Sequence, residues 1–218
     1  MKLMSSSIGR KVLMALSGLF LVVFLTQHFF INITSVFSES LYNTLSHFMG
    51  SNPIVQFLLQ PILILGVVFH FVMGFYLEIL NSKSRRKNYS KYSGSENASW
   101  ISRNMIFSGG VILLFLVLHF IDFWIPEMNY KYVEVLPQDP NRYFEELVHK
   151  FESPLRTVIY SISFIFLALH LLHGFSSSFK TVGVNSKYYN LIQKFTFLFS
   201  LLIPIGFIFI AIFHNLTS

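Results

Sequence analysis

An apolar stretch that carries one histidine occurs twice in this chain of 218 residues. Residues 16–30 (LSGLFLVVFLTQHFF) match residues 107–121 (FSGGVILLFLVLHFI) at an offset of 91, with six identities in fifteen positions. A second pair of stretches, residues 65–75 and residues 165–175, matches at an offset of 100, again through a histidine. The pattern predicts a duplicated helical hairpin, with one histidine on each helix. The four repeated histidines are His28, His70, His119 and His170.

The composition indicates an integral membrane protein. Hydrophobic residues make up 53% of the chain and charged residues only 12%, whereas about a quarter of the residues in a soluble domain are charged. The net charge of +6 does not indicate nucleic-acid binding, because the basic residues lie between apolar segments. The chain has no cysteine, which excludes disulfides, iron–sulfur clusters and thiolate metal sites on it. Histidine remains as the obvious cofactor ligand.

Five segments are long and apolar enough to cross a membrane, which takes about 20 residues of helix. They are residues 12–33, 54–80, 101–125, 155–175 and 189–213. We therefore expect an all-α integral membrane protein with five transmembrane helices that form a single membrane domain over residues 1–218. Four helices would build the core as a duplicated hairpin, and the fifth, which has no counterpart in the repeat, would pack against it.

The distribution of Lys and Arg predicts the orientation in the membrane. Basic residues precede the first span and follow the second and fourth spans, whereas the loop at residues 34–53 has none. By the positive-inside rule, the N-terminus is cytoplasmic and the C-terminus lies outside. The long outer loop at residues 126–153 ends in an amphipathic stretch, residues 143–151, which predicts a short helix at the outer interface.

The depth of each histidine follows from the rise of about 1.5 Å per helical residue. His28 and His119 each lie roughly 25 Å beyond the cytoplasmic charges that precede their helices, so they share a level near the outer face. His70 and His170 share a second level, nearer the cytoplasm. Two histidines at one depth on two helices can take both axial positions of a haem iron. The sequence thus predicts two haem sites and assigns these four histidines as iron ligands.

Other readings of the histidines are weaker. Ionisable residues inside membranes are usually functional, although a single one can simply form a hydrogen bond between helices. Zinc would lack two of its four ligands at each level. His173 competes with His170, but the repeat favours His170, because Met73 stands where a partner of His173 would be. The remaining histidines, His47, His149 and His214, fall at or beyond the ends of the spans, so we expect them to be solvated.

Two haems stacked across a membrane form a path for electrons. This chain has no flavin fingerprint and no cysteine for iron–sulfur clusters, so a partner protein must stand at one end of the path. The basic cytoplasmic face is where we expect that partner, and a lipid-soluble quinone is the expected reactant in the membrane.

Several motifs resemble a known family. They are SSIGRKVLMALSGLFLVVFLTQHFFIN at residues 6–32, and the later runs HFVMGFYLE, LHFIDFW and LHLLHGFSSSFKTVGV. The chain resembles the cytochrome b558 membrane-anchor subunit of succinate dehydrogenase and fumarate reductase, in its single-subunit form with five helices and two haems b. The resemblance implies a proximal, cytoplasmic-side haem on His70 and His170, and a distal, outer-side haem on His28 and His119.

The resemblance also implies partners. Iron–sulfur and flavoprotein subunits, which carry the iron–sulfur clusters and the FAD, would bind on the cytoplasmic side of a bacterial inner membrane. No dicarboxylate active site would lie on this chain, which would relay electrons between the iron–sulfur subunit and menaquinone and would contact lipid but no nucleic acid. The resemblance leaves open whether the enzyme oxidises succinate or reduces fumarate, and whether the complex is a dimer.

The quinone site is the least defined part of the prediction. A quinone needs hydrogen-bond partners for its carbonyls and a route for protons. Polar residues expected near the outer level could supply both, and the candidates are Asp122, Gln56, Gln60, Glu39 and His47. The alternative interpretation is that Asp122, Gln56 and Gln60 are interfacial polar residues that bind no ligand. Four cations that could pair with haem propionates are Arg10, Lys11, Arg103 and Arg156.

Two rival functions remain. The first is another bis-histidine cytochrome b, such as the membrane subunit of a hydrogenase or a formate dehydrogenase. The second is a haem-free transporter or channel whose histidines carry protons, since some transporters are also built from repeats. The absence of paired acidic residues at the predicted midplane argues against this second reading.

Overall fold

The computed structural model describes residues 6–85, 105–184 and 188–218. Five helical segments in these ranges are long and apolar enough to cross a membrane. In chain order they are α2 (Ser7–Phe37), η1 (Val55–Leu59) with α4 (Gln60–Arg85), α7 (Met105–His119) continued by η2 (Phe120–Trp124), α8 (Ile125–Met128) and η3 (Asn129–Val133), α10 (Pro154–Thr181), and α11 (Tyr189–Thr217). The predicted fold class, an all-α chain with five transmembrane helices, is confirmed.

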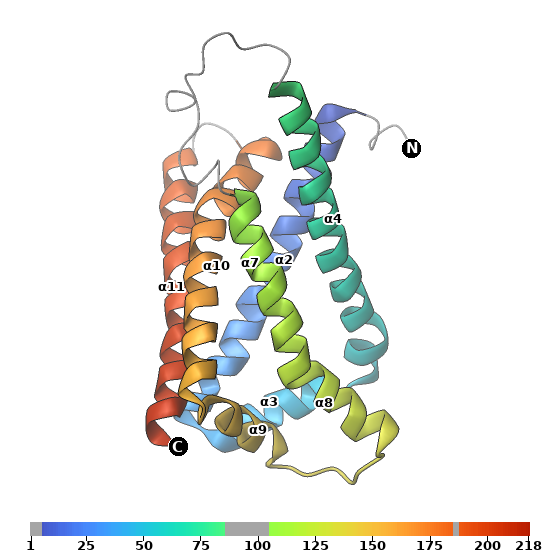
Figure 1. The fold of residues 1–218 in the computed structure, drawn as a ribbon, viewed down its shortest axis with the longest axis vertical. Helices are drawn as coiled ribbons and strands as arrows, with labels where there is room; N and C mark the ends of the chain where they lie inside the picture. Colours follow the sequence, from blue (N-terminus) through green and yellow to red (C-terminus); the bar gives the residue numbers. More distant parts are fainter. Residues whose placement is uncertain (1–5, 86–104, 185–187) are drawn as a thin grey trace.

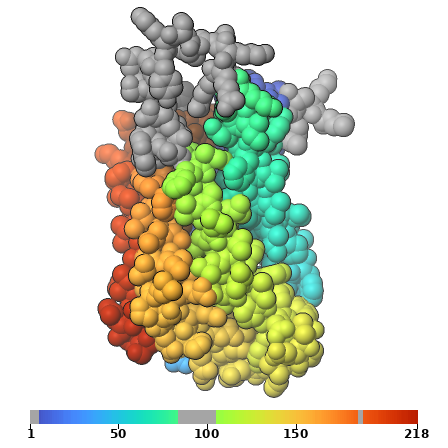
Figure 2. Space-filling view, viewed as in Figure 1, coloured from blue at the N-terminus to red at the C-terminus, as the bar shows by residue number. Residues whose placement is uncertain are grey.

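The long helices lie side by side along the long axis of the molecule (Figure 1). The two termini lie at opposite ends, as an odd number of spans requires. We call the end with the N-terminus the inner end and the end with the C-terminus the outer end. On the face shown in Figure 2, α7 lies between α10 and α4.

Local signals in the sequence set where several helices begin. The hydroxyl of Ser6 accepts a hydrogen bond from the backbone N–H of Gly9 at 2.9 Å and caps α2. Ser153 caps α10 in the same way, and Pro154 follows at the first helical position, where its fixed φ and missing N–H cost nothing.

The outer end is more helical than the sequence analysis predicted. The segment 34–53, expected to be a loop, contains α3 (Glu39–Ser51), which begins at an N-cap formed by Ser38. The third span continues through Pro126 to Val133 in α8 and η3 instead of ending near residue 125. The expected amphipathic helix is present as α9 (Arg142–Phe151). Both α3 and α9 lie across the outer end of the long helices (Figure 1).

Packing is uneven between the helices. The last helix, α11, packs against α10 and α2 and buries His214, Pro204 and Ser200 almost completely. In contrast, Met73 is the one residue of α4 that is buried in the part of the chain that the structure describes. Exposed apolar side chains, among them Leu65, Val68 and Val72, lie along α4, as on a helix that faces lipid. The segment after the second span, to which the sequence analysis assigns basic residues, lies mostly outside the described residues.

Candidate functional site

The inner pair of histidines lies between α4 and α10. The ring centroids of His70 and His170 are 6.4 Å apart, and the ring planes are inclined at 70°. Each imidazole also has a serine beside it. The Ser17 hydroxyl on α2 is 3.0 Å from Nδ1 of His70, and the Ser108 hydroxyl on α7 is 3.2 Å from Nδ1 of His170. Four helices therefore meet at the inner pair.

A glycine follows each of these serines and lies against the same imidazole. A Cβ atom added to Gly18 would lie 3.3 Å from Cε1 of His70, and one added to Gly109 would lie 3.6 Å from Cε1 of His170. A methyl group at the first position would crowd the ring, whereas one at the second would be in ordinary contact. The Ser-Gly dipeptide, which is part of the sequence repeat, thus forms one wall beside each inner histidine.

The outer pair lies between α2 and the end of α7. The ring centroids of His28 and His119 are 5.8 Å apart, and the rings are nearly perpendicular, at 88°. Aromatic side chains surround this pair within 6.5 Å between ring centroids, namely Phe24, Phe115, Phe123, Tyr160 and Phe207. The outer pair is therefore enclosed by rings, whereas serine and glycine lie beside the inner pair.

Hydrogen bonding is weaker at the outer pair. Among the described residues, the buried Nδ1 of His119 has no hydrogen-bond partner. The amide nitrogen of Asn32 is 3.5 Å from both ring nitrogens of His28, which is longer than an ordinary hydrogen bond, and it donates instead to the His28 carbonyl at 2.8 Å. A buried ring nitrogen without a hydrogen-bond partner is costly, so the outer pair lacks the support that the serines give the inner pair.

The spacing within both pairs fits axial ligation of a haem. A metal–imidazole bond is about 2 Å long and the ring centre lies roughly 1 Å further, so two imidazoles on one iron stand roughly 6 Å apart. The observed separations of 5.8 and 6.4 Å match this value. In the described part of the chain, no three His, Asp or Glu side chains cluster as a metal site. A haem brings four nitrogens of its own and needs only two axial imidazoles, so the spacing within each pair is compatible with it.

Asp122, one of the quinone candidates, is buried in η2 one turn beyond His119, with only 2% of its surface exposed. Its carboxylate accepts a hydrogen bond from the Tyr160 hydroxyl at 2.8 Å and pairs with the Arg156 guanidinium at 3.0 Å. The Tyr160 ring in turn contacts His119. Asp122 thus ties α10 to the third span beside the outer pair, and Arg156, one of the four predicted propionate partners, is engaged by it.

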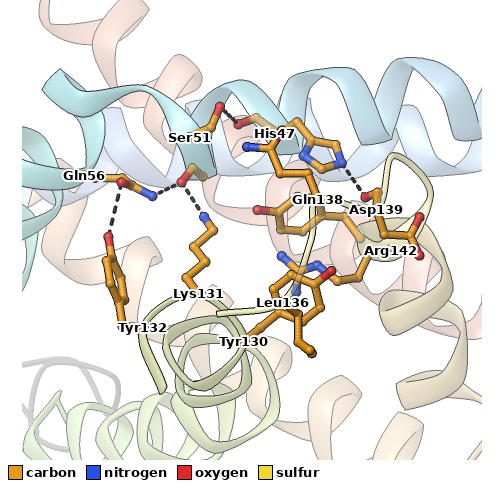
Figure 3. Close-up of a pocket in the computed structure, with 12 residues that line it drawn as sticks. His47, Ser51, Gln56, Tyr130, Lys131, Tyr132, Leu136, Gln138, Asp139 and Arg142 are labelled. Atoms are coloured by element: carbon orange, nitrogen blue, oxygen red, sulfur yellow. Dashed lines mark hydrogen bonds between the residues drawn. The ribbon is translucent and has the colours of Figure 1, made fainter. Parts of the chain in front are cut away.

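A pocket of about 280 Å³ opens at the outer end, between α3, η1, η3 and the segment that leads to α9 (Figure 3). Its lining residues are His47, Gly50, Ser51, Gln56, Tyr130, Lys131, Tyr132, Leu136, Gln138, Asp139, Arg142 and Tyr143. Two of the predicted quinone residues, His47 and Gln56, face this pocket. The side chain of Gln56 bonds the Gly50 carbonyl and accepts from the Tyr132 hydroxyl at 3.3 Å, while His47 Nε2 is 2.9 Å from the Asp139 carbonyl.

Charged and aromatic groups hold the pocket together. The Arg142 guanidinium pairs with Glu127 and Glu146 and lies over the rings of Tyr130 and Tyr143, 4.1 and 4.4 Å from their centroids. Burial lowers the pKa of Arg142, but the hydrogen bond and the ion pair with Glu127 raise it by more, so the net shift is upward. Burial and the hydrogen bond to Glu127 raise the pKa of Tyr143. Arg142 is therefore always a cation and Tyr143 a neutral donor.

The other quinone candidates lie elsewhere. Glu39 is exposed at the first turn of α3, and Gln60 begins α4 one turn beyond Gln56. Neither residue, nor Asp122, lines the outer pocket. The structure therefore brings together two of the five predicted residues and separates the rest. The sequence analysis missed Lys131, Arg142 and Tyr143, because their meeting depends on how α9 folds back onto the third span.

One prediction about the other histidines is wrong. His214 is not solvated, because α11 continues to Thr217 and buries its side chain, which is only 2% exposed. Its Nε2 lies 2.8 Å from the hydroxyl of Ser35 on α2. His149 is exposed, as predicted, and pairs with Glu152. Arg103 lies outside the described residues, and Lys11 is exposed on the first turns of α2.

Comparison with known proteins adds no identification. No family model matches the chain, and neither a curated protein nor a solved structure is significantly similar to it.

Proposed function

We propose that this chain is the membrane-anchor dihaem cytochrome b of a succinate:menaquinone oxidoreductase or a fumarate reductase. Its role would be to relay electrons between an iron–sulfur subunit on the cytoplasmic side of a bacterial inner membrane and menaquinone. The proposal rests on the family resemblance of the sequence motifs and on one structural observation, which is the pairing of the four repeated histidines.

The pairing carries the haem assignment. His70 faces His170 at 6.4 Å and His28 faces His119 at 5.8 Å, each pair across two helices. Four histidines that served only as hydrogen-bonding residues would have no reason to pair at a spacing that suits an iron between them. A haem b bound at each pair would supply a one-electron carrier.

The chain's own residues would orient and insulate these sites. The helices hold the imidazoles, and the side groups next to each ring set its orientation and its strength as a ligand. Phenylalanine rings around the outer pair, such as Phe115 and Phe207, exclude water. A dry surrounding favours the less charged state of a bound redox group.

The outer pocket is our candidate for the quinone headgroup. It lies at the membrane end where His28 and His119 are also located. Its lining includes His47, Gln56 and Tyr132, whose N–H and O–H groups bond protein acceptors and would have to turn to a bound quinone (Figure 3). Carbonyl oxygens of a quinone accept from such donors. The double variant His47→Ala/Gln56→Ala should lose quinone reduction and keep both haems. Loss of a haem in that variant would instead indicate a structural role.

The inner end is our candidate for the docking surface of the iron–sulfur partner. Lys11, Lys83 and Lys180 are exposed at that end, and their positive charge would attract an acidic partner surface. A partner that copurifies with the chain and carries FAD and iron–sulfur clusters would support a succinate dehydrogenase or fumarate reductase. A copurifying hydrogenase or formate dehydrogenase would overturn this part of the proposal.

The first experiment is the haem b content of the purified membrane protein, measured together with the reduced-minus-oxidised spectrum. Two haems per chain with low-spin bis-histidine bands are expected. A colourless protein would overturn the electron-transfer proposal in favour of the transporter reading.

A further inference from the structure

Two serines at the inner histidine pair make the same pair of contacts. The Ser17 hydroxyl is 2.9 Å from the backbone carbonyl of Met14 and 3.0 Å from Nδ1 of His70. The Ser108 hydroxyl is 2.9 Å from the carbonyl of Met105 and 3.2 Å from Nδ1 of His170. The serines come from different helices, α2 and α7, at matching positions of the sequence repeat.

One arrangement of protons satisfies both contacts of each serine hydroxyl. A serine has a single O–H donor, and a carbonyl oxygen can only accept. When the hydroxyl donates to its own helix carbonyl, its oxygen has lone pairs left to accept a hydrogen bond from the imidazole. The proton of each neutral imidazole then resides on Nδ1, and Nε2 carries the free lone pair.

A free Nε2 is what iron ligation requires. Histidines that bind a metal through one nitrogen usually donate the other N–H to a nearby acceptor, which fixes the tautomer and ring orientation and makes the imidazole a stronger ligand. His70 and His170 have this acceptor in the protein itself. Neither outer histidine has one at hydrogen-bonding distance among the described residues.

A third serine–histidine contact involves the other ring nitrogen. Ser35 also donates to a carbonyl of its own helix, at 2.7 Å from the Asn32 oxygen, but it meets Nε2 of His214 rather than Nδ1. That contact occupies the nitrogen that a metal would use at the inner pair. The two serines at the inner pair both leave that nitrogen free.

We propose that Ser17 and Ser108 are positioning residues for the inner haem: each holds its histidine in the Nδ1–H tautomer with Nε2 directed to the iron. This inference rests on the proposed haem function and assigns a role to the Ser-Gly repeat that ligation alone leaves unexplained. The serines would therefore tune the redox potential of the inner haem and not that of the outer haem.

The test compares Ser17→Ala, Ser108→Ala and the double variant with the unchanged protein, each purified with its copurifying partners. Redox titration at the haem bands and low-temperature EPR report each haem without an activity assay. We expect the potential of the inner haem to shift upward, because a weaker imidazole donor stabilises the ferric state less. The double variant should shift more than either single variant, or lose the inner haem alone.

Three controls make the test selective. The outer haem is an internal control, and its potential should not move. Ser200→Ala removes a completely buried hydroxyl on α11 that bonds the Thr196 carbonyl, and it should leave both haems unchanged. Ser17→Thr and Ser108→Thr retain the hydroxyl and should restore the inner haem toward its original potential.

The possible failures can be told apart. If the double variant keeps two haems with unchanged potentials and EPR signals, the serines do not position the ligands, while the haem function stands. An equal shift of both haems would show a general loosening of the fold and would also overturn the inference. If the unchanged protein holds no haem, both the inference and the proposed function are wrong.

Discussion

The inner and outer histidine pairs have similar spacing but different surroundings. At the inner pair, serine hydroxyls contact the Nδ1 atoms of His70 and His170, and small residues lie against the rings. At the outer pair, phenylalanine rings surround His28 and His119, and Nδ1 of His119 has no partner in the described part of the chain. Two sites with the same ligands are thus built from polar contacts in one case and aromatic packing in the other.

If both pairs bind haem as proposed, the same ligands would form two sites with different redox properties. Axial ligands set the class of a haem site, while hydrogen bonds to the ligands and burial adjust its potential. The pairs differ in the hydrogen bonds to the imidazoles and in the aromatic packing around them. Under the proposed function, the two haems could therefore be tuned separately by mutations at opposite ends of the same bundle.

The largest expected effect is the loss of one haem at a time. His70→Ala or His170→Ala should remove the inner haem and leave the outer one, whereas His28→Ala or His119→Ala should do the reverse, because each iron loses one of its two axial ligands. Haem content should fall from two per chain to one, measured on the purified protein. His149→Ala, which changes an exposed histidine, is the control. Retention of both haems in His70→Ala would contradict the assignment.

The next largest effect concerns α9, the helix that lies across the outer end (Figure 1). Arg142→Ala removes a guanidinium that is paired with Glu127 and Glu146 and stacked on two tyrosines. Losing one partner of a mostly buried ion pair costs about 3 kcal/mol. The anchor of α9 should loosen, so the outer haem should be released at a lower temperature than in the unchanged protein.

The inner haem should not respond to Arg142→Ala, because α9 lies at the opposite end of the bundle (Figure 1). Glu145→Ala on the exposed side of the same helix is the matched control and should leave both haems unchanged. Equal release of both haems would mean that α9 supports the whole bundle rather than its outer end.

The helices could be predicted from the sequence because apolar length alone decides whether a segment can span a membrane. The ends of the helices could not. The third span was expected to end near residue 125, yet the helix continues through Pro126, which follows the π-helical turn η2. A π-helical turn shifts the backbone hydrogen bonds beside it, which the sequence does not reveal. The extra turns of α11 likewise bury His214, which a count of span length places in solvent.

The partners of the histidines were beyond prediction for a different reason. Helical rise gives the depth of His28 and His119, but not the direction in which each ring points. The Ser-Gly dipeptide was visible as a repeat, but Ser17 and His70 are 53 residues apart, and their contact depends on how α2 and α4 rotate against each other. Likewise, the outer pocket needs α9 to fold back over the third span.

A smaller effect is expected at Asp122, which lies beside the outer pair. Asp122→Ala leaves the Tyr160 hydroxyl and the Arg156 guanidinium without their carboxylate. An unsatisfied buried polar group costs about 2 kcal/mol, and the part-exposed Arg156 can turn to water, so we expect no more than that. The apparent melting temperature should fall. Asp122→Asn keeps an oxygen that can accept from Tyr160, so its melting temperature should fall less. Equal decreases in the two variants would show that the charge alone matters.

The smallest effect separates the two glycines at the inner pair. Alanine in a helix interior is favoured over glycine by about 1 kcal/mol, so Gly109→Ala should leave the inner haem unchanged and slightly raise the melting temperature. At Gly18 the added methyl group would lie 3.3 Å from Cε1 of His70, closer than the 3.6 Å at the His170 position. The ring must move by a few tenths of an ångström, which offsets the gain in helix stability. Gly18→Ala should therefore alter the EPR signal of the inner haem alone, and identical spectra for the two variants would show that the wall beside His70 is no tighter than the wall beside His170.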